Sequence, residues 1–154
     1  MRRTCSIFIG VSFLLIMPGI ETTACPLELP TSAISIKGYP LIVELATTPA
    51  ARGCGLSHRD ELPQNNGMLF VFAEPRPHTF WMKDTSIALS IAFLDDSGRI
   101  FSIQDMLPLD TDRHYPSGQP ASYALEVNQG WFGRHGIEVG DVVKMKLPLV
   151  LDIR

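Results

Sequence analysis

The chain has 154 residues, 45% of them hydrophobic and 19% charged, with a formal net charge of −3. This length suits one domain. The weakly acidic balance argues against a nucleic-acid partner, which needs a basic surface, and it gives no attraction to anionic lipid.

Residues 1–24 have the order of an export signal. Arg2 and Arg3 precede an almost purely apolar run at 6–20, and small residues at 22–24 suit a signal peptidase. The apolar run is shorter than the about 20 residues of a membrane span and contains a proline and a glycine. We therefore expect cleavage after residue 24 and an exported protein, periplasmic or secreted, with an uncleaved anchor as the alternative.

Cys25 and Cys54 are the two cysteines that such cleavage would leave. In an oxidising compartment they could pair, closing a loop of about 30 residues, which stabilises a fold by roughly 3.5 kcal/mol in the chain-entropy model. Cys25 directly after Thr-Thr-Ala also resembles the acceptor of a bacterial lipoprotein, and only in that case would we expect a membrane partner. Spacing does not decide between the two.

The domain itself is expected at 33–154, after a proline-containing tether at 25–32. Apolar runs from Ala33 to Ile36 and from Leu41 to Ala46 flank a turn and predict a hairpin.

A short helix is predicted from Pro49 to about His58. Thr48 can accept a hydrogen bond from an early helical amide, and proline suits the first turn. Gly53 and Gly55 each weaken a helix by about 1 kcal/mol relative to alanine. We therefore expect a neighbour packed closely against both glycines.

The stretch 67–100 is the predicted centre of the sheet. It contains three strand-like apolar runs, at 68–72, 79–82 and 89–94. The first is apolar on both faces, as in a buried strand, while two prolines within 73–77 predict a loop. Asp95-Asp96-Ser97-Gly98 predicts a hairpin turn between the third run and a strand at 100–107.

The last third of the chain begins with a proline-rich loop at 108–120, either a solvated connector or a functional loop. A strand at 121–127, a helical turn at about 130–135 and a closing strand at 142–147 follow. Seven or eight short strands with one short helix predict a mainly β fold, an antiparallel β-sandwich or a partly open barrel.

The sequence predicts no metal site and no cofactor. Its four histidines do not form a close pair of the kind that zinc sites use. Asp105, Asp110 and Asp112 could bind calcium, but they lack the alternation of a calcium loop and are better explained as solvated charges. Cys54, near the start of the expected helix, could be an acidified thiol, although pairing with Cys25 explains it more simply. Phosphate-binding, dinucleotide-binding and serine-nucleophile motifs do not occur.

The candidate site is the Trp-Met-Lys-Asp segment that begins at Trp81. Strand alternation places Trp81 and Lys83 on one face. If a neighbouring strand contributes Glu126 and Asn128, the group would line a polar cleft for a small anionic or zwitterionic ligand. Alternatively, Trp81 fills the edge of the core while Lys83 pairs with Glu126 or Asp84.

Four motifs carry a family resemblance: Arg52-x-x-Gly55-Leu56-x-x-Arg59, Gly67-Met68-Leu69-Phe70-x-Phe72, Phe80-Trp81-Met82-Lys83-x-Thr85 and Leu125-Glu126-Val127-Asn128-x-Gly130. Together they resemble the bacterial and archaeal family known as domain of unknown function 192, over roughly residues 33–154. The resemblance implies a small, often exported, β-rich sandwich-like domain, and no biochemical activity is established for the family as a class.

The chain departs from the family pattern at three places. Asp84 stands where asparagine is customary, Ser90 replaces an acid, and Ser57-His58 replaces a Met-Phe-like pair. The loss of an acid at position 90 weakens any mechanism in which that carboxylate is catalytic. The candidates common to family and sequence are Arg52, Arg59, Trp81, Lys83 and Glu126.

We therefore expect a ligand-binding or accessory module whose partner is a small molecule or another protein. The rival expectation is an enzyme in which Lys83 or Glu126 is the general acid or base and Arg52 or Arg59 holds an anion. The rival requires these side chains to converge in one open cleft beside Trp81. A structural partner subunit, the third class, would show a contiguous exposed apolar patch.

Overall fold

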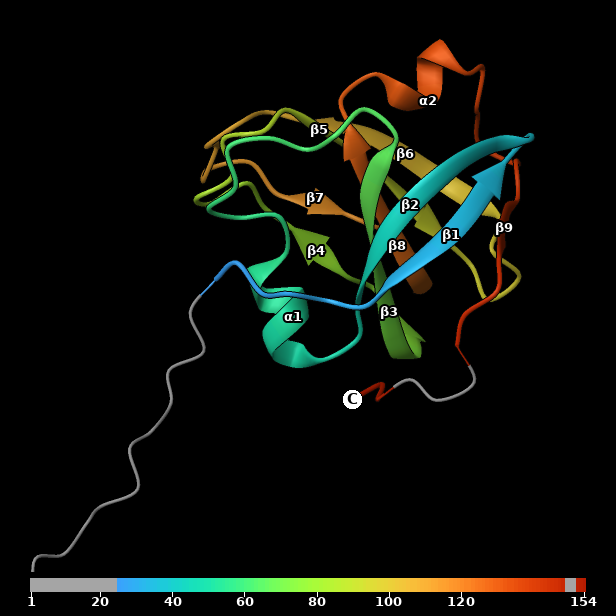
Figure 1. Cartoon of the computed structure of the whole chain (residues 1–154), viewed down its shortest axis with the longest axis horizontal. Coiled ribbons are helices and arrows are strands. Elements are labelled where there is room, and N and C mark those ends of the chain that lie inside the picture. The colour runs from blue at the N-terminus through green and yellow to red at the C-terminus, as the bar shows by residue number, and fades with distance from the viewer. Residues whose placement is uncertain (1–24, 149–151) are drawn as a thin grey trace, which may run out of the picture.

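The computed structural model describes residues 25–148 and 152–154, and the expected export signal at 1–24 lies outside them. In the described part of the chain, a curled seven-stranded sheet forms a half-barrel beside a small two-stranded sheet, with two short helices (Figure 1). The elements are β1 (Thr31–Ile36), β2 (Tyr39–Ala46), α1 (Pro49–Cys54), β3 (Asn66–Arg76), β4 (Thr79–Phe80), β5 (Leu89–Leu94), β6 (Ile100–Met106), β7 (Tyr115–Pro116), β8 (Ala121–Asn128), α2 (Trp131–Arg134) and β9 (Val143–Met145).

The large sheet has the order β6-β5-β8-β3-β2-β1-β9, and β4 pairs with β7 in the small one. Every strand pair is antiparallel except β2–β3. Parallel neighbours need a crossover connection, and the segment that contains α1 supplies it. The mainly β fold class is thus confirmed, as a partly open barrel. No helix among the described residues is long and apolar enough to span a membrane.

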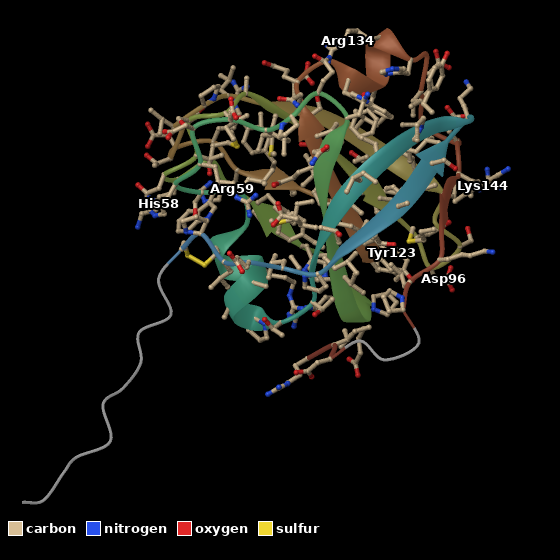
Figure 2. The ribbon with its side chains drawn as sticks, in the orientation of Figure 1. His58, Arg59, Asp96, Tyr123, Arg134 and Lys144 are labelled. Atoms are coloured by element: carbon tan, nitrogen blue, oxygen red, sulfur yellow. A yellow bond between two sulfur atoms is a disulfide. The ribbon has the colours of Figure 1, made fainter. Side chains whose placement is uncertain are left out.

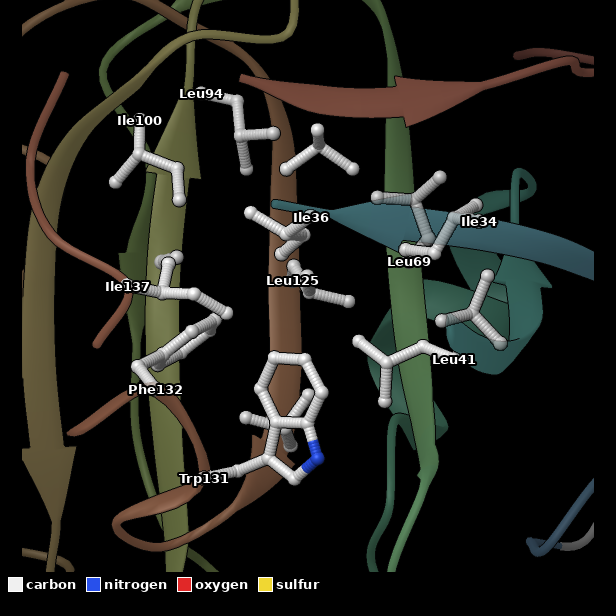
Figure 3. Packing of buried hydrophobic residues seen from close by; sticks show 14 of the residues in the cluster. Ile34, Ile36, Leu41, Leu69, Leu94, Ile100, Leu125, Trp131, Phe132 and Ile137 are labelled. Atoms are coloured by element: carbon white, nitrogen blue, oxygen red, sulfur yellow. The ribbon is translucent and has the colours of Figure 1, made fainter. Parts of the chain in front are cut away.

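Two hydrophobic cores lie on opposite faces of the sheet, because β3 and β8 bury side chains on both sides. The inner core joins strands from both ends of the sheet with α2, so it fills the inside of the curl; it includes Ile34, Ile36, Leu69, Leu94, Ile100, Leu125, Trp131 and Phe132 (Figure 3). The outer core packs the other face against α1 and the small sheet; it includes Ala51, Leu56, Met68, Phe70, Met82, Phe93 and Ala124. Because β3 is buried on both faces, successive residues of the run at 68–72 are apolar.

The structure corrects the prediction for the first helix. Thr48 caps α1 by accepting from the Ala51 amide at 3.2 Å, as expected, but the helix ends at Cys54 and not near His58. A Cβ on Gly53 would meet nothing within 4 Å, and one on Gly55 would make only ordinary contact with Phe70 at 3.5 Å. The expected close packing against both glycines is therefore wrong. Gly55 has φ +51°, a conformation that glycine adopts without strain and that ends the helix.

Three further boundaries differ from those expected. β1 begins at Thr31, so the tether is shorter than 25–32. β3 continues to Arg76, which pairs with Ala121 after an irregularity, although a loop was expected from residue 73. Only Thr79–Phe80 of the tryptophan-lysine segment is a strand, and it belongs to the small sheet. The middle strand of the large sheet is β3, which contains the predicted run at 68–72, and β8 lies beside it.

Candidate functional site

A hollow of about 220 Å³ opens between α1 with its following turn and the segment after β4. We call it the α1 cleft. Its lining includes the two half-cystines together with His58, Trp81, Lys83, Asp84 and Glu126. Four of the predicted site residues, Trp81, Lys83, Asp84 and Glu126, therefore share one concave surface, and Arg52 borders it.

Glu126 lies deepest among the charged groups of the cleft. Strand alternation in β8 turns it toward the outer core, with Met68 of β3 and Ile91 of β5 as its cross-strand partners. The residue is only 5% exposed, and burial raises the pKa of its carboxyl group to about 8. No other described residue makes a hydrogen bond with that carboxyl group. At neutral pH it is therefore mainly protonated, and it presents an unused donor to the hollow.

Gly67 explains how β3 can run so close to β8 at this point. A Cβ at position 67 would lie 2.5 Å from the backbone oxygen of Glu126 and 3.1 Å from a methyl carbon of Val127. Only a residue without a side chain allows this approach. The glycine therefore helps to fix the backbone that carries the buried carboxyl group.

Trp81 and Lys83 form the rim of the cleft. Alternation after β4 buries Met82 in the outer core and leaves Trp81 55% exposed. The Lys83 ammonium nitrogen lies 5.7 Å from the centroid of the Trp81 ring, in the range of a cation–π contact. The two side chains thus lie together, as predicted, and the alternative that Trp81 fills the edge of the core is wrong.

His58 and Asp84 face each other at the mouth of the cleft, and both have unusual backbones. Their φ angles are +59° and +54°, in the left-handed region that non-glycine residues rarely adopt. The His58 amide donates to the Asp84 carbonyl oxygen at 2.8 Å, and His58 Nε2 lies 4.0 Å from Asp84 Oδ2. Strained residues cluster at functional sites more often than elsewhere. Sequence reasoning missed His58, although the departure at Ser57-His58 marked the position.

The disulfide between Cys25 and Cys54 forms one wall of the cleft. Its Cα atoms are 5.5 Å apart, and it joins the segment before β1 to the last residue of α1. Leu27 and Leu29 of that segment pack against the outer core. Figure 2 shows the disulfide beside His58, on the side of the molecule away from Lys144 and Asp96.

Arg52 borders the cleft, but its guanidinium group is used to hold backbone. Nη1 donates to the Thr47 and Val71 carbonyl oxygens at 2.5 and 3.1 Å, and Nη2 donates to the backbone oxygen of Arg154. The group also lies over the Phe72 ring, 5.7 Å from its centroid. Burial, with the nearby charge of Arg76, lowers the pKa of Arg52.

Arg59 and Asn128 lie outside the cleft, which corrects the expected single site. Arg59 makes a two-pronged ion pair with Glu44, at 2.5 and 2.7 Å, on β2. Asn128 Nδ2 donates to the carbonyl oxygens of residues 62 and 63 at 2.9 and 3.1 Å, which fixes the turn before β3. Both side chains are therefore committed to structure.

The remaining candidate groups are also accounted for. No set of three or more His, Cys, Asp or Glu side chains in the described chain is placed to hold a metal ion. Asp110 Oδ1 accepts from two amides of its own loop, at 3.0 Å each. Ser90, at the position of the missing acid, donates to Asp105 at 2.5 Å and accepts from the Gly130 amide at 3.0 Å. It is a structural link between β5, β6 and α2.

Comparison with known proteins gives a family match and two similar structures. The family model DUF192, described as "Uncharacterized ACR", matches residues 32–145. A proposed transcription regulator from Sinorhizobium meliloti 1021 is 32% identical, with a TM-score of 0.74 over 78% of this chain and 97% of that one. A protein of unknown function from Novosphingobium aromaticivorans DSM 12444 is 34% identical, with a TM-score of 0.70 over 75% of this chain and 86% of that one. No curated protein matches the chain.

Proposed function

The chain belongs to the DUF192 family, and we propose that it is a small exported domain that binds a zwitterionic ligand in the α1 cleft. One observation carries the proposal: the buried carboxyl group of Glu126 faces a hollow and makes no hydrogen bond with any described residue. Its oxygen atoms are not among the fully buried side-chain atoms that lack a partner, so they are accessible from the hollow. A ligand that accepts a hydrogen bond from the protonated carboxyl group can therefore take the place of solvent there.

The rim defines the charges of the ligand. Lys83 offers a cation and Asp84 an anion, side by side at the opening, while the exposed Trp81 ring gives a flat apolar surface. An ammonium group suits the Asp84 side and the Trp81 face, and a carboxylate suits Lys83. An acceptor oxygen of the ligand would reach the protonated Glu126. This combination describes a small amino acid or a similar zwitterion.

The size of the cleft agrees with that class. Its volume of about 220 Å³ is below the about 300–1,000 Å³ of sites for drug-sized molecules. A molecule of several heavy atoms fits, and a polymer does not enter. Binding at such a site gains little from buried apolar area, so polar complementarity has to supply the specificity.

We place this function outside the cytoplasm. The disulfide between Cys25 and Cys54 supports that location, because such bonds persist in oxidising compartments. A lipid on Cys25 would use the same sulfur atom, so the two modifications exclude each other. Mass spectrometry of the protein purified from its own cells separates them, since a lipidated chain gains a diacylglycerol-sized adduct and leaves Cys54 as a free thiol.

The binding proposal is tested with three probes that differ by one charge. L-Serine carries both charges, 3-hydroxypropionate lacks the ammonium group, and ethanolamine lacks the carboxylate. We expect saturable shifts of the Trp81 indole and Lys83 NMR signals, with L-serine binding at least about tenfold more tightly than either other probe, which corresponds to about 1.4 kcal/mol.

The control compares two glutamates. Glu126→Met, which keeps the length of the side chain and removes its donor, should weaken L-serine binding at least about tenfold, whereas Glu126→Gln keeps an N–H donor and should bind more tightly than Glu126→Met. Glu138→Met, at an exposed glutamate, should leave binding unchanged. Equal binding of the three probes, or no saturable shift with any of them, would contradict the proposal.

A small enzyme is the second candidate, and the Glu126 environment is what favours it. A carboxyl pKa of about 8 lies near physiological pH, as a general acid or base requires. Arg52 does not fit the expected role of an anion clamp in this cleft, since its donors hold backbone oxygens. An enzyme would convert a bound probe on prolonged incubation, whereas a binding domain returns it unchanged.

The transcription-regulator name of the Sinorhizobium meliloti relative would imply contact with DNA. The formal net charge of −3 does not support such contact for this chain. We therefore do not extend that role to it.

A further inference from the structure

A second hollow, of about 290 Å³, lies next to the α1 cleft and shares Trp81 with it. We call it the arginine hollow; the residues that matter in it are Arg52, Phe72, Arg76, His78 and Trp81. The Arg76 guanidinium has no carboxylate partner within ion-pairing distance among the described residues, whereas Arg52 donates to main-chain oxygens, including that of Arg154. A concave surface with unpaired positive charge is unexpected on an acidic protein.

Arg76 is the freest of these groups. It is the last residue of β3, where pairing with β8 resumes at Ala121 after a shift of register. Such irregularities redirect side chains. The Arg76 guanidinium makes no hydrogen bond or ion pair with another described residue. Glu74 lines a neighbouring small hollow together with Arg52, Arg76 and Arg154 but does not pair with Arg76.

His78 lies near both arginines and is held by ring stacking and by two hydrogen bonds of its backbone. Its ring is stacked on Phe72, with 3.4 Å between centroids and 14° between planes. Its amide donates to Ser117 Oγ at 3.0 Å, and the Ser117 amide donates to its carbonyl oxygen at 2.8 Å. Nε2 is buried and has no partner. Burial and the charges of Arg76 and Arg52 lower the pKa of His78 to about 4, so the imidazole is neutral.

We infer that the arginine hollow is a second binding site, for an oxyanion, phosphate or carboxylate, attached to an aromatic ring. The anion would bind the Arg76 guanidinium, whose donors have no partner among the described residues. The positive charge of Arg52 nearby would add to the attraction, although the donors of Arg52 remain on backbone oxygens. A planar guanidinium can donate two N–H groups to two oxygen atoms of either a carboxylate or a phosphate. The exposed Trp81 ring and the edges of Phe72 and Phe80 supply the apolar walls for the ring.

This site is independent of the zwitterion proposal, because its polar groups do not include Glu126, Lys83 or Asp84. The two hollows share the lining residues Arg52, Gly53, Phe70, Phe80 and Trp81, but the polar groups proposed to bind each ligand differ. A failure of L-serine to bind therefore says nothing about the arginine hollow, and the reverse also holds.

The test measures binding of phenyl phosphate and benzoate at pH 7 through the His78 ring and Trp81 indole NMR signals, with phenol as the neutral probe. We expect saturable shifts with at least one of the two anions, and binding of phenol at least tenfold weaker. Preference between the two anions identifies the oxyanion. Arg76→Gln should weaken anion binding at least tenfold and leave the melting temperature nearly unchanged, since Arg76 makes no contact that the fold needs.

Two matched controls complete the experiment. Arg113→Gln removes an exposed arginine of the 108–120 loop, and Lys144→Gln removes an exposed lysine of β9; both should bind the anion like the unmodified protein. Arg52 is left intact because it holds the backbone of α1 and β3. The inference is overturned if neither anion shifts His78, if phenol binds as tightly as the anions, or if Arg113→Gln weakens binding as much as Arg76→Gln.

Discussion

The two faces of β8 place their side chains in different environments. Leu125 and Val127 turn to the inner core, where the side chains are apolar and Trp131 is fully buried. Ala124 and Glu126 turn to the outer face, where the core is interrupted by a hollow with a buried carboxyl group. One strand thus joins a face packed in the apolar core to a face that lines the α1 cleft, the proposed binding site.

The two tryptophans repeat this contrast. Trp131 is 0% exposed, and its indole nitrogen donates to Asn65 Oδ1 at 3.2 Å, so both its apolar and polar parts are satisfied. Trp81 is 55% exposed, and no hydrogen bond joins its indole nitrogen to a described residue. The exposed Trp81 ring therefore contributes less to the apolar core than Trp131 does and is accessible to the ligand proposed for the α1 cleft.

Removing Trp131 should have the largest effect on stability. Trp131→Ala leaves a cavity in the inner core and an Asn65 amide without its partner, so we expect a loss of about 3–5 kcal/mol in the free energy of unfolding. Urea denaturation measures it. A loss below about 1 kcal/mol would show that the inner face is not the stabilising one.

Glu126 should make stability depend on pH. Its pKa is about 8 when folded and near 4.5 when exposed, so the folded protein binds the extra proton between these values. The contribution of Glu126 to the free energy of unfolding should therefore be fully present below about pH 4.5 and be lost as pH rises through 8, by about 3 kcal/mol between pH 5 and 8. Glu126→Gln should remove this slope, whereas the slope should persist in Glu138→Gln.

A substitution at Gly67, where β3 lies close to β8, should have a smaller effect on the free energy of unfolding. Gly67→Ala places a Cβ against the Glu126 backbone oxygen, and overpacking of this kind costs about 1–3 kcal/mol. Gly53→Ala is the matched control, because a Cβ there meets nothing within 4 Å; it should be neutral or stabilise by up to about 1 kcal/mol. Equal effects of the two substitutions in thermal unfolding would refute the role assigned to Gly67.

Trp81→Ala should have the smallest effect on stability and a large one on binding. Because more than half of the ring is exposed, we expect less than about 1 kcal/mol in unfolding. Binding of L-serine should nevertheless weaken at least about tenfold. A stability loss comparable with that of Trp131→Ala would place Trp81 in the core after all.

The sequence predicts the direction of a side chain from its strand better than it predicts whether that side chain is buried. Alternation correctly assigns Leu125 and Val127 to one face of β8 and Glu126 to the other, and places Trp81 with Lys83. Alternation does not show which elements pack on a given face of a strand. It therefore could not predict that Trp81 is exposed or that its segment belongs to the small sheet.

The main errors in predicting the site residues came from contacts between residues that are distant in the sequence. Arg59 is paired by Glu44, which no local pattern connects with it. His58 and His78 acquire their roles only from the segments that fold against them, the turn at Asp84 and the arginines of α1 and β3. Sequence motifs identify such residues as candidates, but their surroundings depend on the tertiary structure.

The central claim is that Glu126 is buried, protonated and available to a ligand, and its own titration tests this most directly. The ¹³C shift of the Glu126 carboxyl carbon should be followed from pH 4 to 9, with and without L-serine. We predict a midpoint near pH 8 in the free protein and a higher midpoint with L-serine, because the ligand accepts a hydrogen bond from the protonated form. A midpoint near pH 4.5 that L-serine does not change would contradict the claim.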